Sequence, residues 1–433
     1  MPSSRRTFVL SAGTALAATR VWGANDRVPV AVVGLGGRGR DHMNEYGKLP
    51  ESEVVALCDV NQAALERGQA HVLKASGKQP RGFSDMRKLF EDKDVLAVSM
   101  PLPNHWHALA TIWACQAGKD VYIEKPASHN IYEGQKMVEA ARKYGRMVQV
   151  GSQSRSIGHK QKALKLLSEG IIGKVHTGRG LCYRNRQGIG TKPDQGTPPP
   201  GVDWSYFLGP APMRPFNENR FAYNWHWFWD TGNGDIGNQG VHEMDILLWG
   251  LGPKLPTKIQ SSGGRYIWND QGETPNMQVA TYDFGDYQAV FEVRNLPTNS
   301  EAELPMGNGS VVGNLFYGSE GILAVSQRGF QVYKGDKREK VMDEKPVEAR
   351  DWDTSPHMRN FLQAVKSRRH QDLNADIEVG ARAAAMCHLG NIAYRLGRTV
   401  QFDPQAQRFV RDPQADRLAT RDYRKPYIVP EKV

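Results

Sequence analysis

The segment VPVAVVGLGGRGRDHM constrains the fold of this chain more than any other. Val28–Val33 is a continuous apolar run rich in valine, which is typical of a strand buried on both faces. It leads into Gly34, Gly36 and Gly39 at the G-x-G-x-x-G spacing, directly before a helical pattern. A strand, a tight glycine turn and a helix in this order predict the first unit of a parallel sheet that binds a dinucleotide.

A carboxylate at the end of the next strand pattern strengthens this prediction. The run EVVALCDV contains Asp59, which stands 25 residues after Gly34. An acid at that distance accepts hydrogen bonds from the adenosine ribose hydroxyls and would repel a 2′-phosphate. The sequence therefore favours NAD over NADP, although Arg38 in the glycine loop could contact phosphate and keeps NADP open. The predicted pyrophosphate cradle, at a positive helix N-terminus, consists of Gly34, Gly36, Gly37, Arg38 and Gly39.

Strand and helix patterns alternate as far as residue 153. The runs DVLAVSM, KDVYIEKP and RMVQVGSQSR predict strands, and helices are expected over 108–117 and 131–144. This alternation predicts a doubly wound parallel sheet over residues 26–153, which collects ligands at the carboxyl ends of its strands. The predicted cofactor-binding residues at those ends are Asn104, His107, Glu124, Lys125 and Gln153. An ammonium such as that of Lys125 can orient a substrate hydroxyl beside a nicotinamide, although pairing with Glu124 or a backbone carbonyl is the alternative.

The glycine loop and the segment NHWHALATIWACQAGKDVYIEKP together resemble the Gfo/Idh/MocA family, named for glucose–fructose oxidoreductase, inositol dehydrogenase and a rhizopine-catabolism protein. The resemblance extends over nearly all of the chain after residue 25, and the E-K-P motif is its most specific part. It implies a nicotinamide cofactor and a sugar-like polyol substrate. It also implies a C-terminal α/β domain whose large open sheet serves as a substrate wall and as the surface of a homodimer or homotetramer.

From residue 154 the pattern changes to a helix over 158–169 followed by strand-like runs without intervening helices. Such runs predict a mixed or mostly antiparallel sheet in a second α/β domain over 154–400, with an arm over 401–433. Residues 185–230 form a long irregular insert whose aromatic side chains suit stacking on a sugar, or anchoring of the loop on the sheet. The predicted substrate-binding residues are Arg155, Tyr183, Trp225, Trp227, Asn238 and His242.

The stretch GNGDIGNQGVHEMD carries the candidate catalytic groups. On a helix, Asp235, Asn238, His242 and Asp245 share one stripe beside an apolar stripe. The family resemblance implies that His242 works with Lys125 and an aspartate four residues before it. Asn238 stands at that position and can form hydrogen bonds but cannot take a proton.

His242 is the best candidate base for a hydroxyl proton, because its unperturbed pKa is about 6.5. A structural core histidine is the alternative. Asp235 or Asp245 could supply the missing carboxylate, or could be helix caps and ion-pair partners. The predicted catalytic set is therefore Lys125, Asp235, Asn238, His242 and Asp245.

The first residues predict export. Arg5 and Arg6 precede an apolar stretch that is too short to span a bilayer, which matches a twin-arginine signal over residues 1–25. A chance arginine pair in an ordinary N-terminus is the alternative. The net charge of +10 is scattered without a basic, aromatic-studded stripe, so no nucleic-acid partner and no integral membrane span are expected. Four widely spaced cysteines predict buried free thiols and no metal site.

Two enzyme functions share this predicted site. The first is a dehydrogenase that moves hydride between a sugar, cyclitol or glycoside carbon and the nicotinamide. The second, as in some exported relatives, is a redox-neutral glycoside hydrolase or lyase in which a ring hydroxyl is transiently oxidised before elimination, hydration and re-reduction. Export favours a tightly bound cofactor that is regenerated on the enzyme, since free NAD is scarce outside the cytoplasm. A nucleotide-binding protein that lost catalysis is a third alternative, supported only by Asn238.

Overall fold

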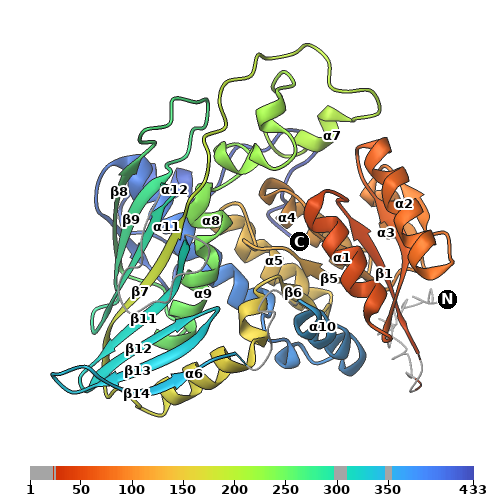
Figure 1. Ribbon diagram of the computed structural model, residues 1–433. Helices are drawn as coiled ribbons and strands as arrows, with labels where there is room; N and C mark the ends of the chain where they lie inside the picture. Colours follow the sequence, from red (N-terminus) through yellow and green to blue (C-terminus); the bar gives the residue numbers. More distant parts are fainter. Residues whose placement is uncertain (1–22, 24–25, 297–309, 347–353) are drawn as a thin grey trace, which may run out of the picture.

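Two sheets of different size carry the fold, with helices packed between them (Figure 1). The computed structural model describes residue 23 and residues 26–296, 310–346 and 354–433 of the chain. Apart from Gly23, Asp26 marks the start of the described part, so the predicted export signal lies outside it. Within these ranges no helix is long and apolar enough to cross a membrane.

The first sheet has six parallel strands in the order β3-β2-β1-β4-β5-β6. Its strands are β1 (Val28–Val33), β2 (Ser52–Cys58), β3 (Arg81–Phe83), β4 (Ala97–Met100), β5 (Asp120–Ile123) and β6 (Val148–Val150). The helices that connect them are α1 (Gly37–Lys48), α2 (Gln62–Ser76), α3 (Met86–Glu91), α4 (His107–Gln116) and α5 (Ile131–Lys143). This strand order belongs to the doubly wound dinucleotide fold, which confirms the predicted class of the first domain.

The central strand β1 explains why its sequence is apolar throughout. Ala31 and Val33 pack into the core on one face of the sheet, and Val30 and Val32 pack into the core on the other. A strand between two helix layers has no solvent face, so no polar residue alternates along it.

The second sheet has ten strands in the order β14-β13-β12-β11-β7-β10-β9-β8-β15-β16. These are β7 (Val175–Arg184), β8 (Lys258–Gly264), β9 (Met277–Asp283), β10 (Gln288–Arg294), β11 (Ser310–Gly318), β12 (Gly321–Ser326), β13 (Gly329–Lys334), β14 (Glu339–Glu344), β15 (Val400–Asp403) and β16 (Arg408–Phe409). Strands β7 and β10 run parallel, and the other described pairs in this sheet are antiparallel. The prediction of a large, mostly antiparallel sheet is confirmed.

Helices α6 (Gly158–Ser168), α9 (Gly240–Leu251) and α11 (Ile377–Leu396) cover the face of this sheet that looks toward the first domain (Figure 1). Glycines on β7 allow α9 to approach closely, because a Cβ on Gly178 would lie 2.8 Å from Leu247. This packing fixes the helix that carries His242.

Late parts of the chain return to the first domain. Helix α10 (Ser355–Ser367) packs on the six-stranded sheet, where the rings of Phe361 and Tyr122 lie 5.9 Å apart. After α12 (Pro413–Leu418) the terminal segment also packs there, with Tyr427 5.4 Å from Trp106. The last part of the predicted arm therefore covers the chain's own first domain, whereas its first part forms the edge strands β15 and β16 of the second sheet.

The four cysteines confirm the expectation of buried free thiols. Cys58, Cys115, Cys182 and Cys387 are all buried and none forms a disulfide. Burial raises the pKa of each thiol, which keeps the sulfur protonated and unreactive.

Candidate active site

The glycine loop between β1 and α1 divides into packing glycines and open glycines. Gly34 has φ +92°, and a Cβ on Gly39 would lie 2.0 Å from the carbonyl oxygen of Gly34. The backbone of the loop itself therefore excludes a side chain at both positions. A Cβ on Gly36 or Gly37 would meet nothing within 4 Å. Helix α1 begins there with no side-chain cap and no acid in its first turn. Its free N–H groups and open cradle fit a dinucleotide pyrophosphate.

Asp59 lies beside this loop and helps to shape it. Its two carboxylate oxygens accept from the backbone N–H of Leu35, at 2.6 Å, and of Asn61, at 2.8 Å. Each oxygen keeps a lone pair, so Asp59 can still accept from a ribose hydroxyl. Burial raises the pKa of this carboxyl, although the two backbone bonds oppose the shift.

Arg38 and Glu124 form an ion pair that the sequence did not suggest. Arg38 Nε donates to Glu124 Oε1 at 2.8 Å, and His42 Nε2 lies 3.1 Å from the same oxygen. The carboxylate can only accept, so His42 donates from Nε2 and accepts from the Ser99 hydroxyl at Nδ1. Burial would raise the pKa of Glu124, but Arg38 and His42 hold it well below its usual range. Arg38 Nη2 is buried without a hydrogen-bond partner among the described residues, so this arginine retains a donor.

Two of the predicted cofactor ligands form hydrogen bonds within the protein. The amide of Asn104 donates to Asn233 Oδ1 at 3.0 Å and is almost fully buried. The ring nitrogens of His107 lie 2.6 Å from the carbonyl oxygen of Pro126 and 2.8 Å from that of Leu102. Both side chains hold loops together, and a contact of either one with the cofactor stays a prediction. Gln153 differs, because its Oε1 is buried without a partner in the described structure.

Lys125 reaches from the end of β5 to the helix pair of the second domain. Its ammonium donates to the carbonyl oxygen of Asn238, at 2.6 Å, across 113 positions of the sequence. Burial lowers the pKa of Lys125, with Glu124 opposing the shift. The structure therefore contains the alternative bond to a backbone carbonyl. This bond fixes the ammonium at the C-terminal end of α8 (Gly234–Asn238).

The predicted stripe of polar groups is split by a break at Gln239 between α8 and α9. Asp235 on α8 is buried and accepts two bonds from Arg186, at 2.9 and 3.0 Å, and one from Asn295, at 2.6 Å. Burial alone would raise the pKa of Asp235, but Arg186 keeps it below its usual value. The Asn238 amide donates to the Tyr223 hydroxyl at 3.1 Å. Asp235 is therefore a fixed negative charge beside the site.

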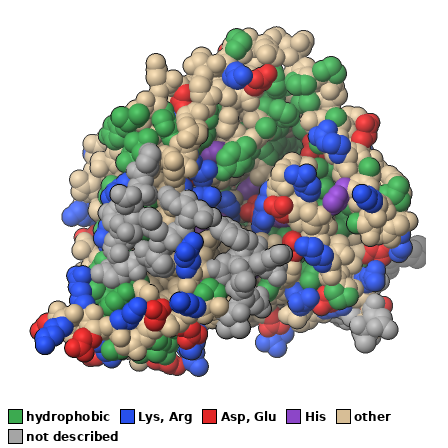
Figure 2. Space-filling view, viewed as in Figure 1, with side chains coloured by type: hydrophobic (Ala, Val, Ile, Leu, Met, Phe, Trp, Pro, Cys, Tyr) green, Lys and Arg blue, Asp and Glu red, His purple; other side chains and the backbone are tan. Residues whose placement is uncertain are grey.

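His242 on α9 remains available as a base. Its ring forms no hydrogen bond to another side chain in the described part of the chain, and the residue is only partly buried. Burial and the nearby Lys125 ammonium lower its pKa well below the ordinary value, so the imidazole is neutral near pH 7. Figure 2 shows basic, acidic and histidine side chains gathered in a hollow near the middle of the molecule.

Asp245 and Arg155 are paired with each other. Arg155 Nε lies 2.9 and 2.8 Å from the two carboxylate oxygens of Asp245, which is almost completely buried. The guanidinium also stacks on Trp249, 4.9 Å from its ring centre. The two residues form a buried ion pair that joins η2 (Gln153–Ser156) to α9, and the predicted roles of Asp245 in catalysis and of Arg155 in substrate binding stay predictions.

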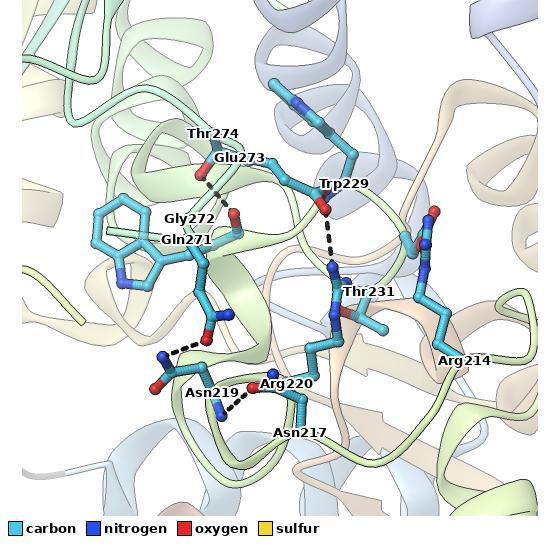
Figure 3. Close-up of polar contacts among 12 residues, drawn as sticks. Arg214, Asn217, Asn219, Arg220, Trp229, Thr231, Gln271, Gly272, Glu273 and Thr274 are labelled. Atoms are coloured by element: carbon cyan, nitrogen blue, oxygen red, sulfur yellow. Dashed lines mark hydrogen bonds and ion pairs between the residues drawn. The ribbon is translucent and has the colours of Figure 1, made fainter. Parts of the chain in front are cut away.

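The insert over 185–230 contains short helical segments rather than a wholly irregular loop. They are α7 (Trp204–Leu208), η3 (Glu218–Arg220) and η4 (Asn224–Trp227). Polar contacts tie the insert to residues 271–274 of the β8–β9 loop, as Figure 3 shows for Asn219 with Gln271 and for Arg220 with Glu273. The Trp229 backbone N–H adds a bond to Glu273 at 2.9 Å.

Three predicted substrate-binding aromatics pack against other side chains. Trp227 is almost fully buried between Arg265 and Trp268, and Trp225 packs on the apolar cluster around Trp204. Tyr183 lies on the face of β7 away from α9, where its hydroxyl donates to Glu292 at 2.7 Å. Substrate binding by Tyr183, Trp225 and Trp227 stays a prediction, and the partners of these side chains depend on strands and loops far away in sequence.

Sequence reasoning missed three side chains close to Lys125 and Asp235. They are Arg186, Tyr223 and His226. The insert had been recognised by its aromatics, but no spacing rule distinguishes Tyr223, which is 57% exposed, from its buried neighbours.

Comparison with known proteins agrees with this architecture. Residues 28–152 match the model "Oxidoreductase family, NAD-binding Rossmann fold", and residues 159–265 and 325–429 match "Oxidoreductase family, C-terminal alpha/beta domain". The chain belongs to the Gfo/Idh/MocA family of oxidoreductases. It thus has an NAD-binding Rossmann domain followed by the α/β domain of that family.

Curated relatives are similar over parts of their length. A "Glycosyl hydrolase family 109 protein" of Saccharopolyspora erythraea is 24% identical over 60% of this chain and 50% of its own length. An "Inositol 2-dehydrogenase" of Salmonella paratyphi B is 31% identical over 39% of this chain and 48% of its own length. A similar family 109 protein from Shewanella is matched over 34% of its length, so the chain spans between a third and a half of these relatives.

Solved structures share the fold. The WlbA dehydrogenase from Bordetella pertussis, in complex with NADH and UDP-GlcNAcA, aligns with a TM-score of 0.65 at 18% identity, over 87% of this chain and 98% of that one. The aldose-aldose oxidoreductase from Caulobacter crescentus, complexed with glycerol, gives a TM-score of 0.65 at 18% identity, over 87% and 100%. At this identity the likeness concerns the fold alone.

Proposed function

We propose that the protein transfers hydride between a hydroxyl-bearing carbon of a sugar, cyclitol or glycoside and a bound NAD. The observation that carries the proposal is the bond from the Lys125 ammonium, just beyond β5 of the Rossmann sheet, to the carbonyl oxygen of Asn238, four residues before the neutral imidazole of His242. The open glycine cradle lies at the same sheet edge, where α/β proteins bind their ligands. The names of the relatives, which include sugar and inositol dehydrogenases, support the substrate class.

When bound, the nicotinamide supplies a hydride acceptor or donor. In this chain the first turn of α1 would hold its pyrophosphate, through the N–H groups beyond Gly36, and Asp59 would accept from the adenosine ribose. Asp59 also favours NAD over NADP, because a 2′-phosphate would face its carboxylate. Arg38, with one unused N–H group, is positioned in the same loop and supports tight binding of the dinucleotide.

The roles of the side chains follow from charge and hydrogen bonding. Lys125 donates to the substrate oxygen and stabilises negative charge that develops on it. His242, neutral near pH 7, accepts the hydroxyl proton. Asn238 holds Lys125 through its carbonyl oxygen, and Asp235 supplies a nearby negative charge that balances the ammonium.

The proposal is tested with purified protein and a panel of free hexoses, cyclitols and aryl glycosides, with nicotinamide absorbance recorded throughout. Reduction of NAD by at least one polyol is the expected result, and Lys125→Met should abolish it while NAD binding persists. A protein that binds no dinucleotide, or a Lys125→Met variant with near-normal turnover, would refute the proposal.

A redox-neutral glycoside hydrolase or lyase is the second candidate. It is favoured by the family 109 glycosyl hydrolase names among the relatives. The same Lys125 and His242 would serve, since the first step is again removal of a hydroxyl proton. Release of the aryl group from a p-nitrophenyl glycoside, without net change in nicotinamide absorbance, would favour this function over a dehydrogenase.

We further propose export through the twin-arginine pathway, directed by residues 1–25. Arg5 and Arg6 before a short apolar stretch support it. A reporter that functions only outside the cytoplasm, fused after residue 30, should be active with the natural sequence and inactive after Arg5→Lys with Arg6→Lys. Equal activity of both fusions would exclude this route.

We also propose that the protein forms a homodimer or homotetramer through the face of the ten-stranded sheet opposite α9. Val279 on β9 points to that face and is 37% exposed there, which supports the proposal together with the family resemblance. Light scattering should give a multiple of the chain mass, and Val279→Arg should shift it toward the monomer. A monomeric natural protein would contradict the assignment.

A further inference from the structure

His226, in the 3-10 turn η4 of the insert, carries a buried hydrogen-bond acceptor that the residues assigned above do not use. Its ring is fully buried, and Nδ1 lies 2.6 Å from the carbonyl oxygen of Tyr223. A carbonyl oxygen only accepts, so Nδ1 bears the hydrogen. Burial lowers the pKa of this imidazole to about 4, so the ring is neutral and Nε2 holds a lone pair.

This Nε2 has no hydrogen-bond partner in the part of the chain that the structure describes. The nearby charged groups bond to other atoms. Asp235 is an acceptor, Lys125 donates to Asn238, and Arg186 donates to Asp235 and to the Tyr223 hydroxyl. A buried acceptor without a donor is costly, and native proteins normally satisfy such a group with a partner.

The position of the imidazole is fixed by its surroundings. A Cβ on Gly232 would lie 2.3 Å from His226 Cα, so the returning chain packs directly on the histidine backbone. The Tyr223 and Trp227 rings lie on its two sides, each with its centre 4.6 Å from that of the imidazole. The contacts of the insert with residues 271–274 hold the whole turn in place (Figure 3).

The ring also shares its electrostatic surroundings with the candidate catalytic groups. The Asp235 carboxylate raises its pKa and the Lys125 ammonium lowers it, although burial outweighs both. Contacts place the ring near the ammonium as well, because His226 packs on Tyr223, the Tyr223 hydroxyl accepts from the Asn238 amide, and the Asn238 carbonyl oxygen accepts from Lys125.

We infer that His226 Nε2 accepts a hydrogen bond from a second hydroxyl of the substrate, next to the hydroxyl held by Lys125. This inference rests on the proposed function and adds a requirement to it: the preferred ligand carries two neighbouring hydroxyl groups. A neutral acceptor locked in one tautomer rewards a hydroxyl donor and leaves an unpaired nitrogen when that hydroxyl is absent, which is how a polar pocket discriminates strongly.

Two variants separate the acceptor from the rest of the ring. His226→Asn keeps an amide N–H where Nδ1 donates to Tyr223 but has no acceptor at the place of Nε2. His226→Gln places an amide oxygen near that place. His71→Asn on α2 is the matched control, since His71 bonds Asn44 on the surface of the first domain.

The experiment measures binding of myo-inositol, D-glucose, 2-deoxy-D-glucose and 3-deoxy-D-glucose to the NAD-loaded protein by calorimetry, together with turnover. We expect the natural protein to bind at least one full polyol about tenfold to a hundredfold more tightly than a deoxy analogue. His226→Asn should remove that difference, His226→Gln should restore part of it, and His71→Asn should leave it unchanged.

The outcomes are distinct for the inference and for the proposed function. Polyol binding with unchanged discrimination in His226→Asn, or no binding of any probe by the natural protein, overturns the inference even if turnover of another substrate is found. Discrimination that depends on His226 without any hydride transfer overturns the proposed function and leaves His226 as a ligand-binding residue.

Discussion

Two glycines three and five positions beyond Gly34 offer a direct test of the dinucleotide site. A Cβ on Gly39 would lie 2.0 Å from the Gly34 carbonyl oxygen, whereas a Cβ on Gly37 would meet nothing within 4 Å. Gly39→Ala should therefore disturb the fold, and Gly37→Ala should disturb only a ligand that comes close to the loop. The same chemical change thus has two different expected effects within one turn of helix.

The magnitudes follow from local geometry. Gly37 is the first residue of α1, where alanine is favoured over glycine by up to about 1 kcal/mol, so Gly37→Ala should leave the melting temperature equal or slightly higher. Its methyl group would stand where the pyrophosphate approaches the helix N-terminus, and we expect NAD binding to weaken about tenfold to a hundredfold, or about 1.4 to 2.7 kcal/mol. Gly39→Ala should lower stability by about 1 to 3 kcal/mol, since the backbone must move to relieve the overlap.

Thermal unfolding of the cofactor-stripped protein and calorimetric titration with NAD measure both quantities. Both measurements need protein without bound cofactor, because bound NAD would itself raise the melting temperature. The reasoning fails if Gly37→Ala binds NAD as tightly as the natural protein, since the open cradle would then lie away from the ligand. It also fails if Gly39→Ala melts at the natural temperature.

Four further outcomes test the site and its supports. His242→Gln should lower kcat by about a hundredfold or more, and kcat/KM of the natural protein should stay flat between pH 6 and 8 with respect to this group, because its depressed pKa keeps it unprotonated there; a titration near 6.5 that disappears in the variant would contradict this. Arg186→Met should lower the free energy of unfolding by about 3 to 5 kcal/mol in chemical denaturation, because it leaves the buried Asp235 carboxylate unpaired, and a loss below 1 kcal/mol would show that the ion pair is dispensable. Asp59→Ser should reduce the preference for NAD over NADP in parallel titrations; an unchanged ratio would remove Asp59 from the ribose site. Buried neutral histidines such as His105, with a pKa of about 3, should make stability fall as the pH drops from about 6.5 to 4, because the unfolded chain gains protons that the fold does not, and a melting temperature that stays constant over this range would argue against their burial.

The first domain was predictable because its signals are local. Each strand buried on two faces is a continuous apolar run, and the glycine turn has a fixed spacing, so β1 coincides with the predicted Val28–Val33. The short edge strand β3 was missed, since Arg81–Phe83 has no apolar pattern and its pairing with β2 comes entirely from the neighbouring strand. In the second domain β7 (Val175–Arg184) is one of the strands predicted after the helix over 158–169.

The site was harder to predict because the role of each side chain depends on partners that are distant in sequence. Lys125 and His242 were found from motifs and remain the proposed catalytic pair. Arg155 and Asp245 were predicted as separate functional residues, yet they neutralise each other across 90 positions. Helical phase placed Asp245 on the polar stripe but could not reveal that an arginine from another element would occupy it.

The asparagine at position 238 illustrates how the structure answers a question that the motif raised. The carboxylate expected there by family resemblance is absent, but Lys125 bonds the backbone carbonyl of Asn238, which any residue would provide. A negative charge one helical turn earlier, on Asp235, is held by Arg186 and Asn295 and still opposes the loss of charge from Lys125. The two tasks of one aspartate, to hold the lysine and to balance its charge, are therefore divided between a carbonyl oxygen and a neighbouring acid. Asn238→Asp should then change kcat by less than tenfold. Asp235→Asn should reduce kcat by more than tenfold, because Lys125 loses the negative charge that favours its protonated form. If Asn238→Asp instead increases kcat strongly, the division of tasks is incomplete and the natural protein works without the carboxylate that the family resemblance implies.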